Sequence, residues 1–425
     1  MNEYFADLHV HIGASSSGRP VKITASRDLN FANIVAECVN RKGIQLVGII
    51  DAASPAVLED IQQLLKKGEM EELPQGGLTL KPDSRLYQNI SGDRPQELTV
   101  ILGAEVETSE LSGGFHVLCY FPYLGQMINF SRWLAGFQKN IYLSSQRAKL
   151  SFAQLWEQVS GLGGLVVPAH VFTPHKGMYG CSCARIGEVL PAGVPGIAGI
   201  ELGLSSDSFM ADTLSELAGT TFLTNSDAHS LPKIGREYNL IAMERPDFAE
   251  LKLALAGQQG RRVVKNFGLD PKLGKYHRTF CLVCNEPVEG GPPIFTCPRC
   301  GARGRDIVNG VLDRLASIAD VPDEGWDVCG EGRSVLRDGR LVLREGRPPY
   351  IYQVPLQFLP GLGPKMLNKL LARFGTEMAV LHQAPEEELR EISGEKVASM
   401  IIAAREGKLA LVAGGGGRYG RVNPD

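Results

Sequence analysis

Histidines and carboxylates recur beside short apolar runs in the N-terminal part of the sequence, and these are residue types that bind divalent metals. The pattern starts with DLHVH at residues 7–11. Alternate side chains of a strand share one face, so Asp7, His9 and His11 are expected to point the same way. Two imidazoles with a neighbouring carboxylate suit a borderline metal such as zinc or manganese. We therefore expect these three residues to lie at a metal centre.

Other candidate ligands stand at the end or the start of an apolar run. They are Asp51 after LVGII, Glu105 after LTVILGA, His116 before VLCYF, His170 after LVVPA, and Asp227 and His229 after TFLTNS. Taken singly, a histidine beside a strand is more often a satisfied polar group than a ligand. The set is harder to explain in that way, because five of the eight histidines fall at such places. The pattern therefore predicts a cluster that binds divalent metals.

A cluster of this kind supports the hydrolysis of phosphoesters. Two metals about 3.5–4 Å apart lower the pKa of a bridging water and stabilise the attacking and leaving oxygens. A separate protein nucleophile is then not needed. The candidate catalytic carboxylates are Asp7, Glu105 and Asp227. Asp7 is expected to be too crowded to bind a metal beside both histidines, and to orient an imidazole or the water instead.

The elements that must position these residues are short apolar runs that alternate with amphipathic segments up to about residue 267. The strand-like runs are Tyr4–Val10, Leu46–Ile50, Leu98–Leu102, His116–Phe121, Leu165–Pro168, Ile197–Leu202 and Thr221–Thr224. The expected helices include Phe31–Asn40, Pro55–Lys67, Phe152–Gly161 and Asp212–Leu217. Strands that alternate with helices predict a parallel α/β fold, and about seven such units suit a barrel. In a barrel the chemistry lies at the carboxyl ends of the strands, where the candidate ligands fall.

The overall composition excludes a largely disordered or fibrous chain and suggests two or three domains. Of the 425 residues, 44% are hydrophobic and 21% are charged. The net charge of −3 does not by itself mark a nucleic-acid binder. No apolar run approaches the roughly 18–20 residues of a membrane span, and the first ten residues hold acids where a secretory signal carries basic residues. We therefore expect a cytoplasmic protein without a membrane segment.

Four of the nine cysteines form two CxxC pairs. Cys281 and Cys284 are separated from Cys297 and Cys300 by twelve residues, NEPVEGGPPIFT. Two pairs at this distance close a tetrahedral four-sulfur site, which is typical of a structural zinc. The polar intervening segment does not suit a core of four buried thiols. The sequence therefore predicts a small zinc ribbon that holds one structural zinc.

A glycine turn leads into an expected helix near the C-terminus, in LPGLGPK at residues 359–365. A helix that begins in this way presents backbone N–H groups and the positive end of its dipole to an anion. Gly361, Gly363 and Lys365 are therefore candidate contacts to a phosphate. The motif resembles the helix-hairpin-helix element, with a degenerate second copy at residues 387–396. A plain αα-hairpin with a glycine turn is the alternative.

A polar loop, HVFTPHKGMYGCSC, begins at the candidate ligand His170. Barrel enzymes hold their substrates in such loops, so His175, Lys176 and Tyr179 are candidates for binding a phosphate or stacking on a base. A CxC pair without partners is weak as a metal site, and Cys181 and Cys183 are expected to be structural or incidental.

DLHVH, GAE, the lone histidine at 116, PAH and SDAH together resemble the PHP (polymerase and histidinol phosphatase) family. The resemblance covers roughly residues 1–267 and implies a distorted seven-stranded (β/α) barrel with two or three divalent metals (zinc, manganese or magnesium). It implies that His9, His11, Glu105 and Asp227 hold one metal. Glu105 would bridge to a second metal completed by His116 and His170, and Asp51 and His229 would contribute to a third.

The sequence departs from the usual PHP pattern in two places. Asp51 is followed by Ala52 and Ala53, where many PHP proteins have a histidine. The loop IGASSSGRP after the first motif lacks another histidine that is common there. The third metal therefore loses two usual imidazole ligands.

A PHP core, a zinc ribbon and a helix-hairpin-helix unit, in this order and total length, resemble the endonuclease Q family of prokaryotes. The expected units are a PHP hydrolase domain (1–270), a four-cysteine zinc ribbon (271–305), a connecting segment (306–349), a helix-hairpin-helix domain (350–412) and a flexible tail (413–425). The resemblance implies a DNA repair endonuclease that acts on uracil, hypoxanthine, xanthine and abasic sites. Its nick would fall on the 5′ side of the lesion and leave a 3′-hydroxyl and a 5′-phosphate.

Two alternatives stay open from the sequence. One is a small-molecule phosphatase of the histidinol-phosphate type, which uses the same metals but has no need of the ribbon and the hairpin unit. The other is a DNA-binding module whose PHP barrel is not catalytic, which the retained ligands disfavour. Under the favoured reading the partner is damaged DNA, with other replication or repair proteins as further candidates, and one chain could act as a monomer.

Overall fold

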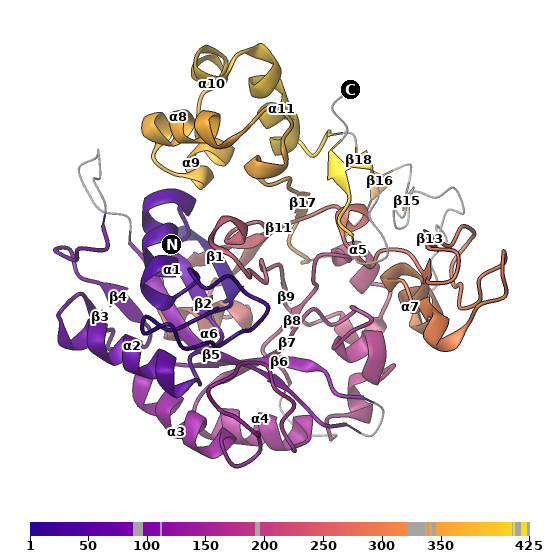
Figure 1. Ribbon diagram of the computed structural model, residues 1–425, viewed down its shortest axis with the longest axis horizontal. Helices are drawn as coiled ribbons and strands as arrows, with labels where there is room; N and C mark the ends of the chain where they lie inside the picture. The colour runs from indigo at the N-terminus through magenta and orange to yellow at the C-terminus, as the bar shows by residue number, and fades with distance from the viewer. Residues whose placement is uncertain are drawn as a thin grey trace.

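The computed structural model describes residues 1–87, 97–110, 113–191, 196–321, 336–337, 340–341, 346–409, 411–412 and 418–422. Within these residues the chain forms a mixed α/β body, a small cysteine-bearing unit and a group of four C-terminal helices (Figure 1).

The N-terminal body is built on a sheet of ten strands in the described part of the chain. Its strands are β1 (Asn2–Val10), β2 (Leu46–Ile49), β3 (Met70–Glu72), β4 (Leu78–Leu80), β5 (Thr99–Glu107), β6 (His116–Phe121), β7 (Leu165–Pro168), β10 (Tyr238–Met243), β11 (Arg262–Gly268) and β17 (Tyr350–Tyr352). A separate parallel pair joins β8 (Ile200–Glu201) to β9 (Phe222–Leu223). The main path runs β17-β11-β10-β1-β2-β5-β4-β3, and β6 joins β5 to β7.

Each of the seven expected strands is present, but the sheet is not parallel throughout. β1, β2 and β5 are parallel, whereas β6 runs antiparallel to both β5 and β7, and β10 runs antiparallel to β1. The segment between β5 and β6 is only eight residues long, which is too short for the helical crossover that parallel strands need. The fold is therefore mixed α/β, and the expected count of seven barrel strands is not confirmed.

The reversal of β6 places its first residue at the edge where β5 ends. In the antiparallel register Glu107 pairs with His116, and Glu105 pairs with Leu118. A histidine that opens β6 thus lies beside the carboxylates that close β5. This is why a strand-opening histidine and strand-ending acids meet at one edge of the sheet.

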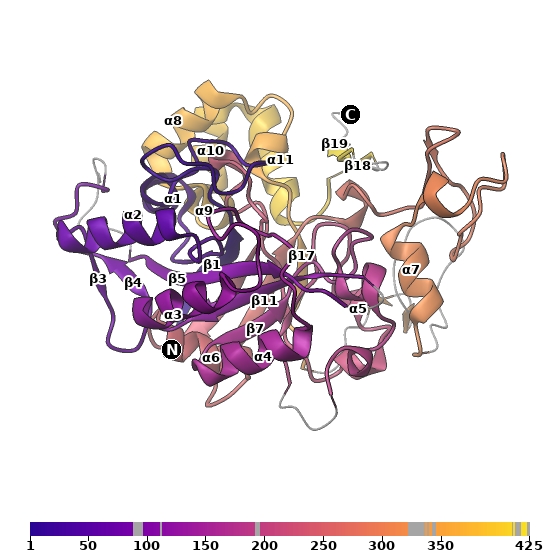
Figure 2. The ribbon, with the colours of Figure 1, turned by 60° about the horizontal axis from the view of Figure 1, so that its bottom comes forward.

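Helices of the body pack against the strands. They are α1 (Phe31–Glu37), which continues into the π-helical η1 (Cys38–Lys42), α2 (Pro55–Lys66), α3 (Leu124–Leu134), α4 (Phe152–Gly161), α5 (Ser208–Ala211) and α6 (Phe248–Leu255). Short helical turns are η2 (Met178–Ser182), η3 (Ile186–Glu188), η4 (Ser215–Leu217) and η5 (Leu231–Lys233). In Figure 2, α4 and α6 lie on one side of the sheet and the C-terminal helices on the other.

Local sequence explains where several helices begin. Ser151 and Gln154 form a capping box at the start of α4, and Asp247 accepts a hydrogen bond from the backbone N–H of Glu250 at the start of α6. The helix expected over Asp212–Leu217 does not form: α5 ends at Ala211, and only the short turn η4 follows.

The cysteine-bearing unit is larger than expected. Its sheet contains β12 (Phe280–Cys281), β13 (Glu286–Pro287) and β14 (Ile307–Val308), and η7 (Gly304–Asp306) precedes β14. The carboxylate of Asp313, on α7 (Val311–Ile318), accepts hydrogen bonds from the backbone N–H groups of Thr279 and Ile294. The expected boundary at residue 305 therefore cuts through this unit. Of the rest of the expected connecting segment, β15 (Leu336–Arg337) and β16 (Arg340–Leu341) form a two-stranded ribbon, and residues 322–335, 338–339 and 342–345 lie outside the described residues.

The C-terminal helices are α8 (Pro364–Phe374), α9 (Glu377–His382), α10 (Glu386–Ser393) and α11 (Glu395–Arg405). The first expected hairpin lacks a full first helix, because only the 3₁₀ turn η8 (Leu356–Phe358) precedes the glycine turn. Its second copy has two helices, joined at Gly394 with φ +78°. A helix-hairpin-helix unit is thus not confirmed.

The C-terminal helices are attached to the sheet by specific contacts. The ammonium of Lys42 lies 2.9 Å from a carboxylate oxygen of Glu377, and both residues are buried. The ring of His382 stacks on Phe5 with centroids 4.8 Å apart, and its Nε2 lies 2.7 Å from the hydroxyl of Tyr238. These contacts fix the helical group against β1 and β10.

Part of the expected flexible tail (413–425) is paired with another strand. β18 (Leu411–Val412) pairs with β19 (Arg421–Val422), and β18 contacts η6 (Pro271–Leu273), while residues 413–417 and 423–425 lie outside the described residues. In the described part of the chain, no helix is both long enough and apolar enough to span a bilayer.

The contact of His382 should make the free energy of unfolding depend on pH. Burial, aided by Arg405 and Lys265, lowers the pKa of His382 to about 4, whereas a histidine in an unfolded chain titrates near ~6.5. The unfolded state therefore takes up the proton first as the pH falls. The stabilisation is complete above pH ~6.5 and is lost progressively toward pH 4.

Urea unfolding of the wild type and of His382→Gln at several pH values checks this. The variant cannot titrate at this position, so its free energy of unfolding should fall less than that of the wild type between pH ~6.5 and 4. Equal slopes for the two proteins would contradict the expectation.

Candidate metal centre

Six side chains from five segments form two adjoining groups of metal-ligand type at the edge where β1, β5 and β7 end. One group consists of His9, His11 and Asp227, and the other of Glu105, His116 and His170. Within each group the ligand atoms lie within 4.8 Å of one another. All six were expected from the sequence to bind metal.

Glu105 joins the two groups. One of its oxygens, Oε1, lies 3.6 Å from His9 Nε2, 2.8 Å from His116 Nδ1 and 3.5 Å from His170 Nε2. Its other oxygen, Oε2, lies 3.7 Å from His11 Nε2. This buried carboxylate is therefore in a position to bridge two ions.

Three imidazole nitrogens test whether this centre fits metal ions. His9 Nε2, His11 Nε2 and His116 Nδ1 are buried and make no hydrogen bond of good geometry among the described residues, although His116 Nδ1 lies 2.8 Å from Glu105 Oε1. An unpaired buried polar atom costs about 1–3 kcal/mol. The separations of 3.3 to 3.7 Å between the nitrogens of His9 and His11 and the oxygens of Asp227 and Glu105 are too long for good hydrogen bonds, and they suit two ligands of one ion. The residues therefore fit divalent metals.

The second ring nitrogen of His9 and that of His11 each lie against a carboxylate. His9 Nδ1 lies 2.9 Å from Glu201 Oε2, and His11 Nδ1 lies 3.1 Å from Asp51 Oδ2. A carboxylate behind a metal-binding histidine fixes the ring orientation and its tautomer. Glu201 also accepts hydrogen bonds from the backbone N–H of His170 and from Asn225, so one buried acid holds three segments together.

Asp51 and His229, the residues expected at a third metal, belong to neither group. The oxygens of Asp51 accept hydrogen bonds from the backbone N–H of Ile12 and the hydroxyl of Ser144 in addition to facing His11. Nδ1 of His229 lies 3.0 Å from the backbone carbonyl of Asp227. In the described part of the chain no third donor joins them. Asp51 thus orients His11, and its role as a ligand stays a prediction.

Asp7 takes a different place from the expected one. Its carboxylate is fully buried and accepts hydrogen bonds from the backbone N–H groups of Ser226 at 3.0 Å and Gly235 at 2.9 Å. It therefore holds the loop that carries Asp227, and it is not among the residues that line the cavity over the centre. Burial, which outweighs these hydrogen bonds, raises the pKa of Asp7.

Two of the ligands have a backbone conformation that is unfavourable for residues other than glycine. His170 has φ +30° and Asp227 has φ +45°. Such strain persists only where surrounding contacts enforce it, and it clusters at functional sites. Here the backbone of Ala228 pairs with that of β1, which holds Asp227 against His9 and His11.

At the centre, positively charged groups and carboxylates stabilise one another's charged forms. Burial would raise the pKa of Glu105, but His116 and Lys22 hold it well below its usual range. Burial would lower the pKa of His9, but the carboxylates around it, with Glu201 foremost, raise that pKa to about 10. Without metal, His9 is therefore protonated near neutrality, and metal binding must displace that proton.

A cavity of about 260 Å³ opens over the two groups. His175 and Lys176, expected from the sequence to bind substrate, line it. Tyr179 does not: its ring is fully buried against Phe172, and its hydroxyl donates to Glu216 at 2.8 Å. Tyr179 therefore packs the loop from behind and does not reach the cavity.

Several residues of the cavity were not singled out from the sequence: Lys22, Glu201, Asn225, Lys275, Tyr276 and Tyr419. Glu201 carries a recognisable signal, because it lies one residue before the end of the run Ile197–Leu202, close to where other candidates stand in theirs. The others lie in loops without a regular pattern. Their contribution depends on tertiary contacts that no spacing encodes.

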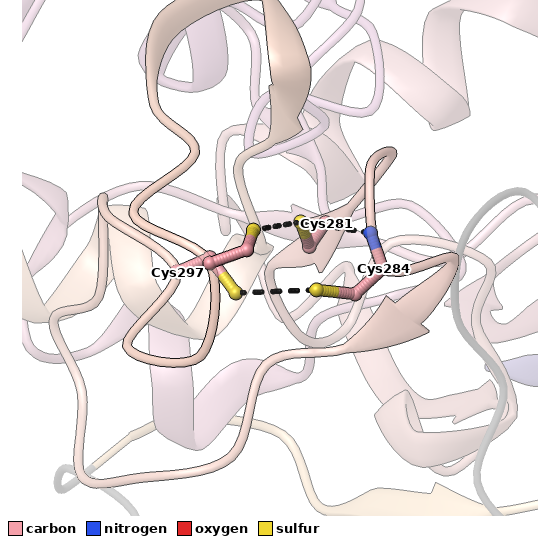
Figure 3. A group of neighbouring side chains, drawn as sticks. Cys281, Cys284 and Cys297 are labelled. Atoms are coloured by element: carbon pink, nitrogen blue, oxygen red, sulfur yellow. Dashed lines mark hydrogen bonds between the residues drawn. The ribbon is translucent and has the colours of Figure 1, made fainter.

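The four cysteines of the two CxxC pairs come together as expected, and Figure 3 shows three of them, Cys281, Cys284 and Cys297. The sulfur of Cys281 lies 3.5 Å from that of Cys300, and the sulfur of Cys284 lies 3.9 Å from that of Cys297. Sulfurs bound to one tetrahedral zinc at about 2.3 Å would have such separations. The site therefore fits a structural zinc.

The glycine turn before α8 is open to solvent. Gly361 has φ +85°, which favours glycine, and Gly363 caps the helix without a side chain. Gly361, Gly363 and Lys365 are all exposed, so the first turn of α8 is accessible to an anion. Their contact with phosphate stays a prediction.

Comparisons with known proteins cover the whole chain. YqxK of Bacillus subtilis, an uncharacterized protein, is 44% identical over 427 residues, which is 100% of both chains. The lesion-specific endonuclease PfuEndoQ of Pyrococcus furiosus is 30% identical, with a TM-score of 0.76 over 99% of this chain and 95% of that chain. A structure of Endonuclease Q with a 27-mer duplex that has an abasic lesion at the active site gives the same TM-score of 0.76 and 30% identity over 99% of this chain and 96% of that chain. A family model described as the MJ0043 C-terminal domain matches residues 365–408.

Glu201→Gln should weaken metal binding at the centre about 10- to 100-fold, because the buried partner of His9 loses its charge. The measurement is a competition for zinc or manganese against a chelating dye. Glu188→Gln is the matched control, since Glu188 accepts only surface hydrogen bonds from Ala184 and Arg185. Equal affinities of Glu201→Gln and the wild type would contradict the role given to Glu201.

Cys284→Ser should reduce the zinc content by one ion per chain, because three thiolates do not close the tetrahedral site. Elemental analysis of the purified protein measures this, with Cys181→Ser as the control at an exposed cysteine outside the ribbon. The same zinc content in Cys284→Ser as in the wild type would rule out a zinc held by all four cysteines.

Proposed function

The chain belongs to the endonuclease Q family, and from that premise we propose that it is a metal-dependent endonuclease that repairs DNA. The proposed substrates are duplexes with a uracil, hypoxanthine or xanthine base or an abasic site. The proposed reaction is hydrolysis of the phosphodiester on the 5′ side of the lesion, which leaves a 3′-hydroxyl and a 5′-phosphate. Both similar endonuclease structures extend over nearly the whole of this chain, which supports the proposal.

The observation that carries the proposal is the buried carboxylate of Glu105, which faces the nitrogens of His9 and His11 in one group and those of His116 and His170 in the other. When two divalent metals are bound there, they supply a water of lowered pKa and the charge that stabilises an in-line displacement at phosphorus. The chain's own residues hold this arrangement rigidly: Glu201 orients His9, Asp51 orients His11, and Asp7 holds the loop of Asp227.

Lys22 adds a fixed cation to the centre. Its ammonium lies 2.9 Å from Glu105 Oε2 and donates to the hydroxyl of Ser145 at 2.6 Å. Lys22 also lines the cavity, so a phosphate seated over the metals would lie beside its positive charge. Lys22 stands two residues after the loop IGASSSGRP, which lacks the usual PHP histidine. We assign to Lys22 the stabilisation of negative charge on the phosphate.

The depth of the centre bears on how a lesion is reached. His9 and His11 are fully buried, and a cavity lined by His11, Glu105 and Asp227 opens over the centre. We infer that the damaged nucleotide leaves the stack to reach this cavity. Extrusion costs least for a mispaired, damaged or missing base. This difference in cost supports the proposed preference for damaged nucleotides.

The duplex on either side of the extruded nucleotide needs contacts that do not read sequence. The exposed first turn of α8, with Lys365, offers backbone N–H groups to a phosphate. Such contacts position DNA without specifying a base. They suit an enzyme whose specificity lies in the damaged nucleotide.

A gel assay on 5′-labelled duplexes tests the proposal. The duplexes carry one uracil, one hypoxanthine, one abasic site or no lesion, and each is incubated with Mg²⁺, Mn²⁺ or Zn²⁺. The wild type should nick the three damaged duplexes just 5′ of the lesion and leave the undamaged one intact. Asp227→Asn should cut at least about 100-fold more slowly, because it removes a charged ligand of the metals.

Asp83→Asn is the matched control for that variant, since Asp83 is an exposed carboxylate away from the cavity, and it should cut like the wild type. Equal cutting of every duplex would mean a nuclease without lesion specificity. Hydrolysis of histidinol phosphate with no cutting of any duplex would replace the proposal by a small-molecule phosphatase.

A further inference from the structure

The end of the chain reaches the cavity above the metal centre. Tyr419 lines this cavity together with Lys275 and Tyr276. The segment is fixed there by the β18–β19 pair and by a hydrogen bond of 2.9 Å from the backbone N–H of Gly420 to the carbonyl of Leu273. Figure 2 shows β18 and β19 beside, and separate from, the C-terminal helices. The segment expected to be a free tail therefore forms part of the cavity wall.

Arg236 ties Tyr419 to the loop of the metal ligand Asp227. Arg236 is buried, and its Nη1 donates to the hydroxyl of Tyr419 at 2.9 Å. Its Nε and Nη2 donate to the backbone carbonyls of Ser226 and Asp227 at 2.7 and 3.4 Å. The ring of Tyr419 is thus held in place relative to the ligands below it.

The rim of the cavity combines aromatic rings with a cation. Tyr276 meets His175 edge to face, with centroids 5.3 Å apart. The ammonium of Lys275 lies 4.6 Å from the centre of the Tyr419 ring. Within the described residues this ammonium has no hydrogen bond or ion pair, so its three N–H donors remain for a ligand. Tyr419 itself is only half-buried, which leaves part of its ring for stacking.

These features match what deamination does to a base. Deamination replaces an exocyclic amino group, which donates hydrogen bonds, with a carbonyl oxygen, which accepts them. It converts cytosine to uracil and adenine to hypoxanthine in this way. An ammonium has donors only, so it can pair with the new oxygen and cannot pair with the original amino group. An aromatic ring beside the ammonium can stack on any base, because every base has a flat π face.

We propose that Tyr419 and Lys275 recognise the extruded base: Tyr419 stacks on it, and Lys275 donates to the carbonyl oxygen that deamination creates. This inference rests on the proposed function and deepens it by naming the residues that choose the substrate. Thymine and guanine also carry carbonyls, and their exclusion rests on the stability of their pairs, which resists extrusion.

Single-turnover cleavage of three duplexes tests the proposal. One has uracil opposite guanine, one has an abasic site, and one has cytosine opposite cytosine, which is mispaired without being deaminated and which the wild type should cut more slowly than the uracil duplex. Lys275→Met and Tyr419→Leu should each cut the uracil duplex about 10- to 100-fold more slowly, from the loss of a charged hydrogen bond or of stacking. Both should cut the abasic duplex within about twofold of the wild type, because it offers no base to hold. Tyr419→Phe, which keeps the ring, should retain most of the preference for uracil.

Two matched controls carry the same substitutions outside the cavity: Lys272→Met on the same segment, and Tyr123→Leu, whose hydroxyl donates to the carbonyl of Pro74. Both should cut all duplexes like the wild type. Metal content and thermal unfolding of every variant separate a loss of recognition from a loss of structure, and Lys275→Met carries the test if Tyr419→Leu does not fold.

The outcomes separate the inference from the proposed function. If the wild type cuts no damaged duplex, both are wrong. If it cuts them while the variants leave the ratio of uracil to abasic cleavage unchanged, the recognition by Tyr419 and Lys275 is wrong and the endonuclease stands. An equal loss on both damaged duplexes with a weaker salt dependence would identify Lys275 as a phosphate contact and would overturn its role in choosing the base.

Discussion

The arrangement of the whole N-terminal body depends on one buried carboxylate, that of Glu105, which needs positive charge on several sides. An ionised acid inside a protein is tolerated only when it is paired and hydrogen-bonded. Glu105 meets this need with Lys22, Ser145 and the imidazoles of four histidines drawn from β1, β6 and the segment after β7. The strands must therefore end at one edge and in one register, and the loops between them must close over that edge.

Much of this could be predicted because strands leave a regular pattern. Apolar runs next to an acid or a histidine predicted that Glu105, Asp227 and His170 lie close together, and the spacing of Cys281 to Cys300 predicted the cluster of four cysteines. The direction of β6 was readable as well, since eight residues between β5 and β6 cannot hold a crossover helix. The parallel fold expected from alternation missed that constraint.

The rest could not be read from local pattern. Tyr419 and Arg236 are 183 positions apart, and no periodicity links a glycine-rich end of the chain to a loop at the edge of the sheet. Asp7 lies close in sequence to the candidate ligands His9 and His11, yet its carboxylate accepts hydrogen bonds from the backbone N–H groups of residues 226 and 235. The loop with left-handed φ at Asp227 leaves N–H groups that need an acceptor. Such pairings follow from the packed structure and not from the order of residues.

The bridge made by Arg236 has a thermodynamic consequence. The same guanidinium holds the carbonyls of the loop that carries Asp227 and the hydroxyl of Tyr419. Undocking of the chain end would leave one N–H donor of this buried guanidinium without its partner, at a cost of about 1–3 kcal/mol. The loop of Asp227 would keep its own two hydrogen bonds to Arg236 in that case. Docking of the chain end therefore adds to the stability of the folded state without being needed to order that loop.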